Sequence, residues 1–239
     1  MEGFSRIDIF DTKGIEYIFV IGYLIIFIVF LKISARQVKL VKQVQRVLGN
    51  LSANVLRIPQ GIFYNRNHTW THLEESGSAK VGLDDLLQHI TGEVRFGNLK
   101  NPGETINKGE VLTEIRQEGK YLRIVSPISG KIMESNSELD ESPQLLNEDP
   151  YSRGWIYKIK PSNWVAETKT CYLAEEATNW SMEELGRFRD FMAVSLKKYS
   201  SGPAMLILQD GGELCDNTLS LFPDEVWKDF QKDFLDFTS

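Results

Sequence analysis

Residues 58–163 alternate short apolar runs with clusters of Gly, Pro, Asn and Ser, and this alternation constrains the fold more than any other feature. Apolar runs of this length, bounded by turn residues, predict β-strands. The expected strands are AKVGL (79–83), GEVRFGNL (92–99), GEVLTEI (109–115), KYLRIVS (120–126), GKIMES (130–135) and GWIYKIK (154–160). The segment 83–91 predicts one short helix, with Asp84 and Asp85 suited to its first turn. Many short strands with one helix indicate a small, mainly β barrel or sandwich.

The pattern changes after Trp164. The capping box Ser181–Glu184 predicts a helix that runs to about Lys198, and the segment 204–214 predicts a strand followed by a glycine turn. Pro223 is expected to open a last helix. That helix carries an apolar stripe, which we expect to pack in the core rather than to dock a partner: Val226, Trp227, Phe230, Phe234 and Phe237. Residues 164–239 are therefore expected to form a C-terminal α/β extension.

The N-terminus contains an uncharged apolar run from Tyr17 to Leu31. With its apolar flanks it approaches the roughly 20 residues that span a bilayer as a helix. No basic segment precedes it and no small-residue cleavage site follows, so a signal peptide is disfavoured. Lys and Arg are scarce before the run and frequent after it. The sequence thus predicts a single-pass anchor in the cytoplasmic membrane, with the N-terminus outside and the C-terminal body in the cytoplasm.

These features divide the chain into four parts. Residues 1–34 are the expected anchor, 35–57 a basic juxtamembrane helix or linker, 58–163 the β domain and 164–239 the extension. The basic segment fits either a helix that lies on anionic headgroups or a solvated connector.

Several classes of function lack support in the sequence. The formal charge of -6 argues against a nucleic-acid partner. Cys171 and Cys215 form no CxxC pair, so packed, reduced thiols are favoured over a disulfide. A metal site is not expected from the three histidines (His68, His72, His89), because His68 and His72 have a helical spacing but lie in a strand-like segment. The acidic cluster (Glu138, Asp140, Glu141, Glu148, Asp149) lacks the spacing of a calcium loop. No nucleophile, phosphate-loop or dinucleotide motif marks an enzyme.

An ordered series of motifs runs through residues 58–163: His68–Thr71, Val81–Gln88, Thr91–Val94, Pro102–Gly103, Gly109–Glu110, a Ser-Pro-Ile-Ser-Gly turn at 126–130, Asn147–Tyr151, Gly154–Trp155 and Lys158–Pro161. In these motifs the segment resembles the glycine cleavage system H-protein family, which carries a lipoyl group. The resemblance implies a barrel-sandwich hybrid of β-strands.

The family's chemistry depends on a lysine at a hairpin tip, which carries lipoate in amide linkage. Counting from Gly109–Glu110 and from Pro127 places that position on Gly119, with Lys120 next to it. Successive residues of a strand point to opposite faces, so a shift of one residue changes direction and reach. Gly119 fits the turn of an ordinary hairpin. We therefore expect no catalytic residue, no cofactor and no metal; the alternative is lipoate on Lys120.

The expected function is that of a non-catalytic, membrane-anchored H-protein-like module. It would be an accessory or scaffold subunit of a protein complex at the cytoplasmic face, with subunits of a membrane-associated redox complex as partners. The alternative is a lipoyl carrier that uses Lys120 for aminomethyl or redox transfer.

Overall fold

The computed structural model describes residues 19–29, 55–199 and 216–236. The chain divides into two compact units, Met1–Val47 and Leu48–Ser239. Each unit is described by itself. The predicted strand at 204–208, Cys215, Phe237 and most of the predicted basic helix lie outside the described residues.

The described part of the first unit is a helix over residues 19–29. None of the helices in the described ranges is both long enough and apolar enough to cross a membrane. The predicted transmembrane helix is therefore wrong. The predicted membrane localisation and topology, which depended on it, are wrong as well.

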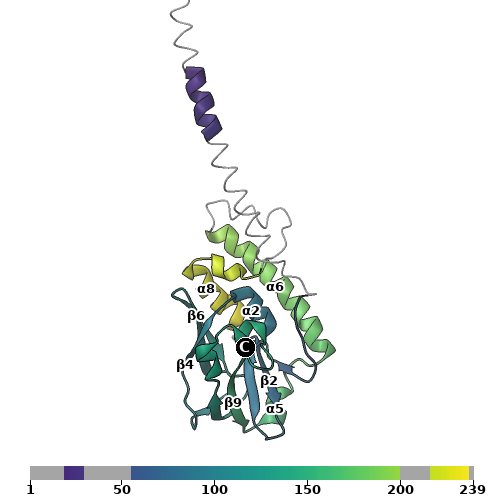
Figure 1. The fold of residues 1–239 in the computed structure, drawn as a ribbon. Coiled ribbons are helices and arrows are strands. Elements are labelled where there is room, and N and C mark those ends of the chain that lie inside the picture. The colour runs from purple at the N-terminus through teal and green to yellow at the C-terminus, as the bar shows by residue number, and fades with distance from the viewer. Residues whose placement is uncertain (1–18, 30–54, 200–215, 237–239) are drawn as a thin grey trace, which may run out of the picture. The chain divides into compact units, whose positions relative to one another are not determined.

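The second unit contains two antiparallel sheets (Figure 1). The larger has six strands in the order β1-β2-β3-β9-β8-β5. Its strands are β1 Phe63–Tyr64, β2 Thr69–Leu73, β3 Ala79–Leu83, β9 Trp155–Pro161, β8 Gly130–Ser135 and β5 Thr105–Ile106. The smaller has the order β4-β6-β7, with β4 Arg95–Asn98, β6 Val111–Gln117 and β7 Lys120–Val125. All six strands expected within residues 58–163 are present, and the sheet architecture agrees with the H-protein-like prediction.

Three short helices connect the strands: α2 Asp85–Thr91, α3 Glu138–Glu141 and α4 Leu145–Glu148. The predicted helix over 83–91 is α2, and Asp84 is its N-cap. The Asp84 carboxylate accepts a hydrogen bond from the Leu87 amide at 2.8 Å, which satisfies one of the free N–H groups of the first turn.

The sheets enclose a core that continues into the C-terminal extension. Ile115, Leu122 and Ile159 from the sheets belong to the same buried cluster as Trp227 and Phe230. A second, smaller cluster gathers Trp70 and Trp180 with their neighbours. The extension is thus part of the packed body, because its aromatic side chains complete the hydrophobic core.

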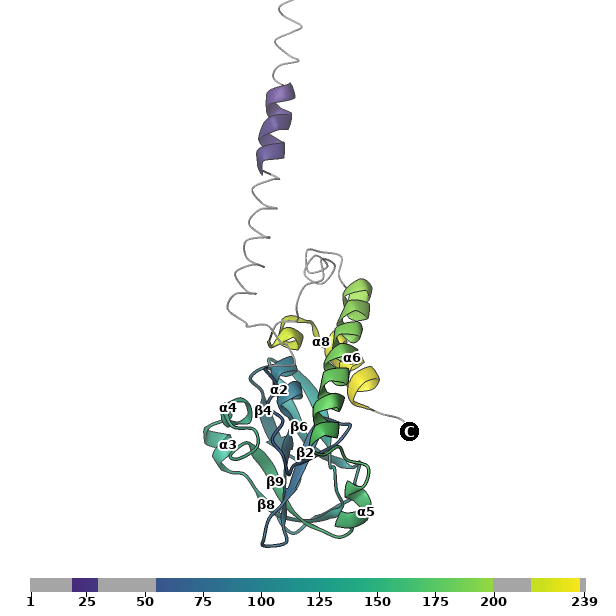
Figure 2. The same ribbon diagram turned by 90° about the vertical axis from the view of Figure 1, so that its right-hand side faces the viewer.

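The C-terminal extension is helical in its described part. It comprises α5 Trp164–Thr168, α6 Glu175–Tyr199, the 3₁₀ turn η2 Thr218–Leu221, α8 Asp224–Phe230 and the π-helical turn η3 Gln231–Leu235. α6 and α8 lie side by side in both views (Figures 1 and 2). Val226, Trp227, Phe230 and Phe234 are buried, so the predicted core-facing stripe is confirmed for them.

The predicted start of α6, directly after an N-cap at Ser181, was wrong by seven residues. The helix begins at Glu175, directly after Ala174, whose φ of 53° ends the preceding turn. Ser181, the expected N-cap, is buried within the helix. Tertiary packing overrides the local capping signal, because Ala177 and Trp180 extend the buried face of the helix by two turns towards its N-terminus.

Candidate functional site

The β6–β7 hairpin ends in a two-residue loop, Glu118–Gly119. Gln117 pairs with Lys120 across its base. Glu118 has φ 49° and Gly119 has φ 84°, the two positive angles of a type I′ turn. Gly119 therefore occupies the turn, as the sequence predicted, and Lys120 is the first residue of β7.

The Lys120 side chain is bound to the C-terminal extension. Its Nζ donates hydrogen bonds to the backbone carbonyls of Ser220, at 2.8 Å, and Phe222, at 3.2 Å. It also lies 5.2 Å from the centroid of the Trp227 ring, within cation–π range. The ammonium group is thus held by two carbonyl oxygens and an aromatic face, on a segment 100 residues further along the chain.

The carbonyls that receive Lys120 are themselves ordered by α8. The Trp227 indole is fully buried and donates to the Leu219 carbonyl at 2.9 Å, which fastens η2 to α8. Gln231 binds the neighbouring part of β7: its side chain accepts from the Arg123 amide at 2.7 Å and donates to the Arg123 carbonyl at 3.3 Å. Since β7 is the edge of the small sheet, Gln231 satisfies backbone groups that an edge strand leaves unpaired.

A buried ionic group joins the larger sheet to the extension. His68 is fully buried, with Nδ1 2.8 Å from Asp84 Oδ2 and Nε2 3.4 Å from Glu184 Oε2. Burial disfavours the charged ring, but the two carboxylates outweigh it and raise the pKa of His68 to about 9. Burial would raise the pKa of Glu184, but His68 and Arg187 hold it below its usual value.

The His68 ring also lies between two aromatic side chains. Its centroid is 5.3 Å from that of Trp180 on α6 and 5.2 Å from that of Phe234 on η3, with interplanar angles of 30° and 9°. One imidazole therefore joins the start of β2 to both C-terminal helices. Nδ1 is hydrogen-bonded to Asp84, whereas Nε2 lies 3.4 Å from Glu184 without a hydrogen bond, so proximity to the two carboxylates stabilises the charged ring.

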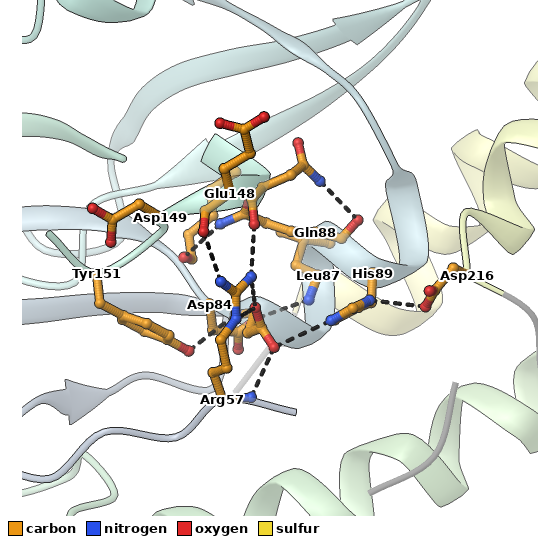
Figure 3. Close-up of polar contacts among 12 residues, drawn as sticks. Arg57, Asp84, Leu87, Gln88, His89, Glu148, Asp149, Tyr151 and Asp216 are labelled. Carbon is orange, nitrogen blue, oxygen red and sulfur yellow. Dashed lines mark hydrogen bonds and ion pairs between the residues drawn. The ribbon is translucent and has the colours of Figure 1, made fainter. Parts of the chain in front are cut away.

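A second ionic cluster is centred on Asp85 in the first turn of α2 (Figure 3). Arg57 donates its backbone amide and Nε to the Asp85 carboxylate at 2.8 and 2.9 Å. His89 Nε2 lies 3.2 Å from the same carboxylate, and its Nδ1 lies 2.8 Å from Asp216. Burial opposes both charges, yet the His89 and Arg57 partners lower the pKa of Asp85, while Asp85 and Asp216 raise that of His89.

The ionic cluster around Asp85 also contacts α4. The Arg57 guanidinium also donates to the carbonyls of Asn147, at 2.6 Å, and Glu148, at 2.8 Å, in α4 (Figure 3). A cavity of about 250 Å³ adjoins the cluster. These contacts explain the placement of α2 against α4, and they give His89 a structural role.

A further cavity of about 240 Å³ lies beside the hairpin tip. Arg95, Arg116 and Glu118 line one part of it, and Pro143 and Gln144, from the α3–α4 connection, line another. Arg95, Arg116 and Glu118 therefore place charged groups in this cavity beside the hairpin tip.

The three histidines do not converge. His68 and His89 belong to the separate clusters above, and His72 is exposed on β2, with Nδ1 3.2 Å from the Gly61 carbonyl. Across residues 19–29, 55–199 and 216–236, no group of three or more His, Cys, Asp or Glu side chains could hold a metal ion. Of the acidic cluster, Glu138 forms an ion pair with Arg153.

Two of the motifs that carry the family resemblance have packing roles. Trp70 pairs with Gly82 across β2 and β3, and a Cβ at Gly82 would lie 2.7 Å from the Trp70 ring, so only glycine fits there. In the Ser-Pro-Ile-Ser-Gly turn, Ser126 Oγ donates to the Ile128 carbonyl at 2.7 Å. A Cβ at Gly130 would overlap the Lys160 carbonyl, so β8 and β9 approach closely only because this residue is glycine.

A family model for the glycine cleavage H-protein matches residues 62–184. A protein named "Probable glycine cleavage system H protein" from Thermococcus gammatolerans is 38% identical over 119 residues, which cover 50% of this chain and 88% of that relative. The chain belongs to the glycine cleavage H-protein family. The "Glycine cleavage system H protein" of Coprothermobacter proteolyticus is 35% identical over 121 residues, which cover 51% of this chain and 94% of that relative.

The chain also matches a solved H-protein structure. The crystal structure of a glycine cleavage system H protein from Mycobacterium marinum has a TM-score of 0.41 and 28% sequence identity to this chain, and the match covers 44% of this chain and 87% of the other. Members of the H-protein family are carriers rather than catalysts, and they normally carry lipoate. The β6–β7 hairpin is thus the part of this family member at which the carrier chemistry has to be tested.

Proposed function

We propose that this chain is an H-protein family member that carries no lipoyl group and acts as a non-catalytic accessory or scaffold protein. In this proposal the carrier position is Gly119, residues 58–163 form the carrier-like domain and residues 164–239 form an added surface. Its partners are proteins, and subunits of a redox complex are the class that carrier ancestry favours.

The environment of Lys120 carries this proposal. A lipoyl group is attached through the ε-amine of a lysine at an exposed tip. The loop of the β6–β7 hairpin consists of Glu118 and Gly119, neither of which has an amine. The adjacent amine, on Lys120, donates to the Ser220 and Phe222 carbonyls. These residues do not fit a lipoyl arm.

Attachment of lipoate to Lys120 would also have an energetic cost. Amide formation removes the positive charge and leaves one N–H for two carbonyl acceptors, and it removes the cation from the Trp227 face. Loss of hydrogen bonds from a charged donor costs about 1.5–3 kcal/mol each. The alternative function, a lipoyl carrier working through Lys120, therefore requires η2 and α8 to move away from β7.

Intact-mass spectrometry of the protein, isolated from cells with an active lipoylation system, tests the proposal. We expect the unmodified mass for the wild type. The matched comparison is Gly119→Lys, which places a lysine in the loop, together with Gly119→Lys/Lys120→Met. We expect both variants to gain a lipoyl group. A lipoyl adduct on Lys120 of the wild type would refute the proposal and establish the carrier alternative.

A further inference from the structure

The outward face of the three-stranded sheet has a charge opposite to that of the whole chain. Arg95 on β4, Arg116 on β6 and Tyr121 on β7 form one cross-strand row, and all three are exposed. The next outward row contains Glu114 and Arg123, paired across β6 and β7. In these two rows three arginines stand with one glutamate, so the rows, termed here the arginine face, are positive on a chain with a formal charge of -6, and Glu93 and Glu118 lie at the adjoining cavity.

The arginines on this face are incompletely neutralised. Glu114 Oε2 lies 2.9 Å from Arg116, and its other oxygen lies 3.8 Å from Arg123. Within the described residues, Arg95 has no hydrogen-bond or ion-pair partner, although it lies directly opposite Arg116. Like charges directly opposite on neighbouring strands are destabilising. A carboxylate bound between Arg95 and Arg116 would convert this repulsion into two charge-assisted interactions.

A cavity beside the arginine face is large enough for one acidic side chain. The cavity of about 240 Å³ beside the hairpin tip is lined by Arg95 and Arg116, together with Pro143 and Gln144. This volume is below the ~300–1,000 Å³ of most small-molecule pockets, so it fits one side-chain head group better than a cofactor. Tyr121, 45% exposed, continues the surface beyond the arginines. Arg and Tyr are the residue types that carry much of the binding energy at protein interfaces.

We propose that the arginine face docks a partner protein through an Asp or Glu side chain that inserts between Arg95 and Arg116. This inference rests on the proposed scaffold function and specifies the partner's chemistry. The carboxylate enters the cavity, the two guanidinium groups donate to its oxygens, and Tyr121 packs against the adjoining segment.

The charges at the cavity rim favour an isolated carboxylate over a polyanion. Glu93 and Glu118 line the same cavity as the arginines. They would repel a nucleic-acid backbone, whose phosphates recur along the whole strand. A protein segment can place one acidic side chain between the arginines and neutral or basic side chains beside the two glutamates.

Peptide display tests this proposal on the full-length chain. A phage-displayed library of random dodecapeptides is selected on the wild type, with counter-selection on Arg95→Gln/Arg116→Gln. The control variant, Arg66→Gln/Arg189→Gln, removes the same charge from exposed arginines elsewhere in the body. Enriched peptides are then synthesised with each acidic residue or its amide, and their affinities are measured with and without an oligouridylate competitor.

We expect the enriched peptides to share an Asp or Glu. Changing it to the amide, or using Arg95→Gln/Arg116→Gln, should weaken binding at least about tenfold, and the two changes together should add little. The control variant should bind within about twofold of the wild type. An empty selection, peptides without an essential acid, or equal loss in the control would overturn the proposal, and displacement by oligouridylate would indicate a nucleic-acid site instead.

Two further measurements separate the possible failures. Thermal unfolding of Arg95→Gln/Arg116→Gln should match or exceed that of the wild type, because the substitution removes a like-charge pair. A lower unfolding temperature would contradict the inference that Arg95 and Arg116 repel each other. A lipoyl adduct on Lys120 would refute the proposed function without affecting the binding result, because the test substitutions leave Lys120 unchanged.

Discussion

Because of the buried His68, the free energy of unfolding is expected to fall as the pH rises into the alkaline range. The pKa of His68 is about 9 in the folded protein, against an ordinary value of 6.5. Because the folded pKa is raised, the stabilisation is fully present below pH 6.5 and is lost as the pH rises through 9. A difference of about 2.5 pKa units corresponds to roughly 3 kcal/mol of unfolding free energy.

The perturbation that isolates this effect is His68→Asn. Residue 68 has φ 57°, a left-handed conformation that Asn tolerates better than most residues, so the backbone can remain unchanged. The variant keeps Asp84 and Glu184 but removes the cation between them and the ring that stacks on Trp180 and Phe234. Leaving buried charges without their partner costs about 3–5 kcal/mol.

The assay is urea unfolding, followed by tryptophan fluorescence, at intervals from pH 6 to pH 10. Near pH 6 the wild type should exceed His68→Asn by about 3–5 kcal/mol, and by pH 10 this difference should have fallen by about 3 kcal/mol. Subtracting the two curves cancels titrating groups common to both proteins. His72→Asn, at an exposed histidine on β2, the strand that follows His68, should change the unfolding free energy by no more than about 0.5 kcal/mol.

An NMR titration of the imidazole gives an independent check. The His68 ring signals should show the charged form at pH 7.5 and change near pH 9. The reasoning fails if the ring titrates below pH 7, or if the stability difference between wild type and His68→Asn is constant from pH 6 to pH 10. Either result would mean that desolvation, rather than the two carboxylates, dominates at this site.

Three further substitutions have expected outcomes. Lys120→Met removes both carbonyl contacts and the cation–π contact, so it should destabilise the body by about 1–3 kcal/mol and speed proteolysis at η2; unchanged proteolysis would contradict the role of Lys120 as an anchor. Phe230→Ala should cost about 3–5 kcal/mol in urea unfolding, and a cost below 1 kcal/mol would show that α8 does not complete the core. Gly130→Ala forces a Cβ against the Lys160 carbonyl and should cost at least about 2 kcal/mol; wild-type stability would refute that close approach.

The sequence was most informative where periodicity and turn chemistry agree. A short apolar run after the turn at 126–130 predicted β8, and Asp84 and Asp85, taken as first-turn residues, predicted the helix over 83–91 that is α2. These signals are local, because a strand or helix end depends mainly on neighbouring residues. The start of α6 failed for the converse reason: the contacts that extend it, through Trp180, come from distant residues.

The site shows the same division. The sequence predicted a turn at Gly119, because a two-residue hairpin loop has a local signature. It gave no indication that Lys120 would bind carbonyls 100 residues away, or that His68 would contact Glu184. The apolar run in the first unit predicted a membrane helix from its composition, whereas no helix within the described ranges is long and apolar enough to cross a membrane.

By itself, the sequence determined the β-rich H-protein fold and the absence of a lysine from the hairpin loop, since both follow from the order and identity of neighbouring residues. Only the tertiary structure decided what Lys120 does. The C-terminal helices fold back on β7 because their aromatic side chains, Trp227 among them, gain more by entering the core than by remaining in water. That packing places the Ser220 and Phe222 carbonyls within hydrogen-bonding distance of the Lys120 amine. No local pattern in the sequence specifies contacts between residues so far apart in the chain.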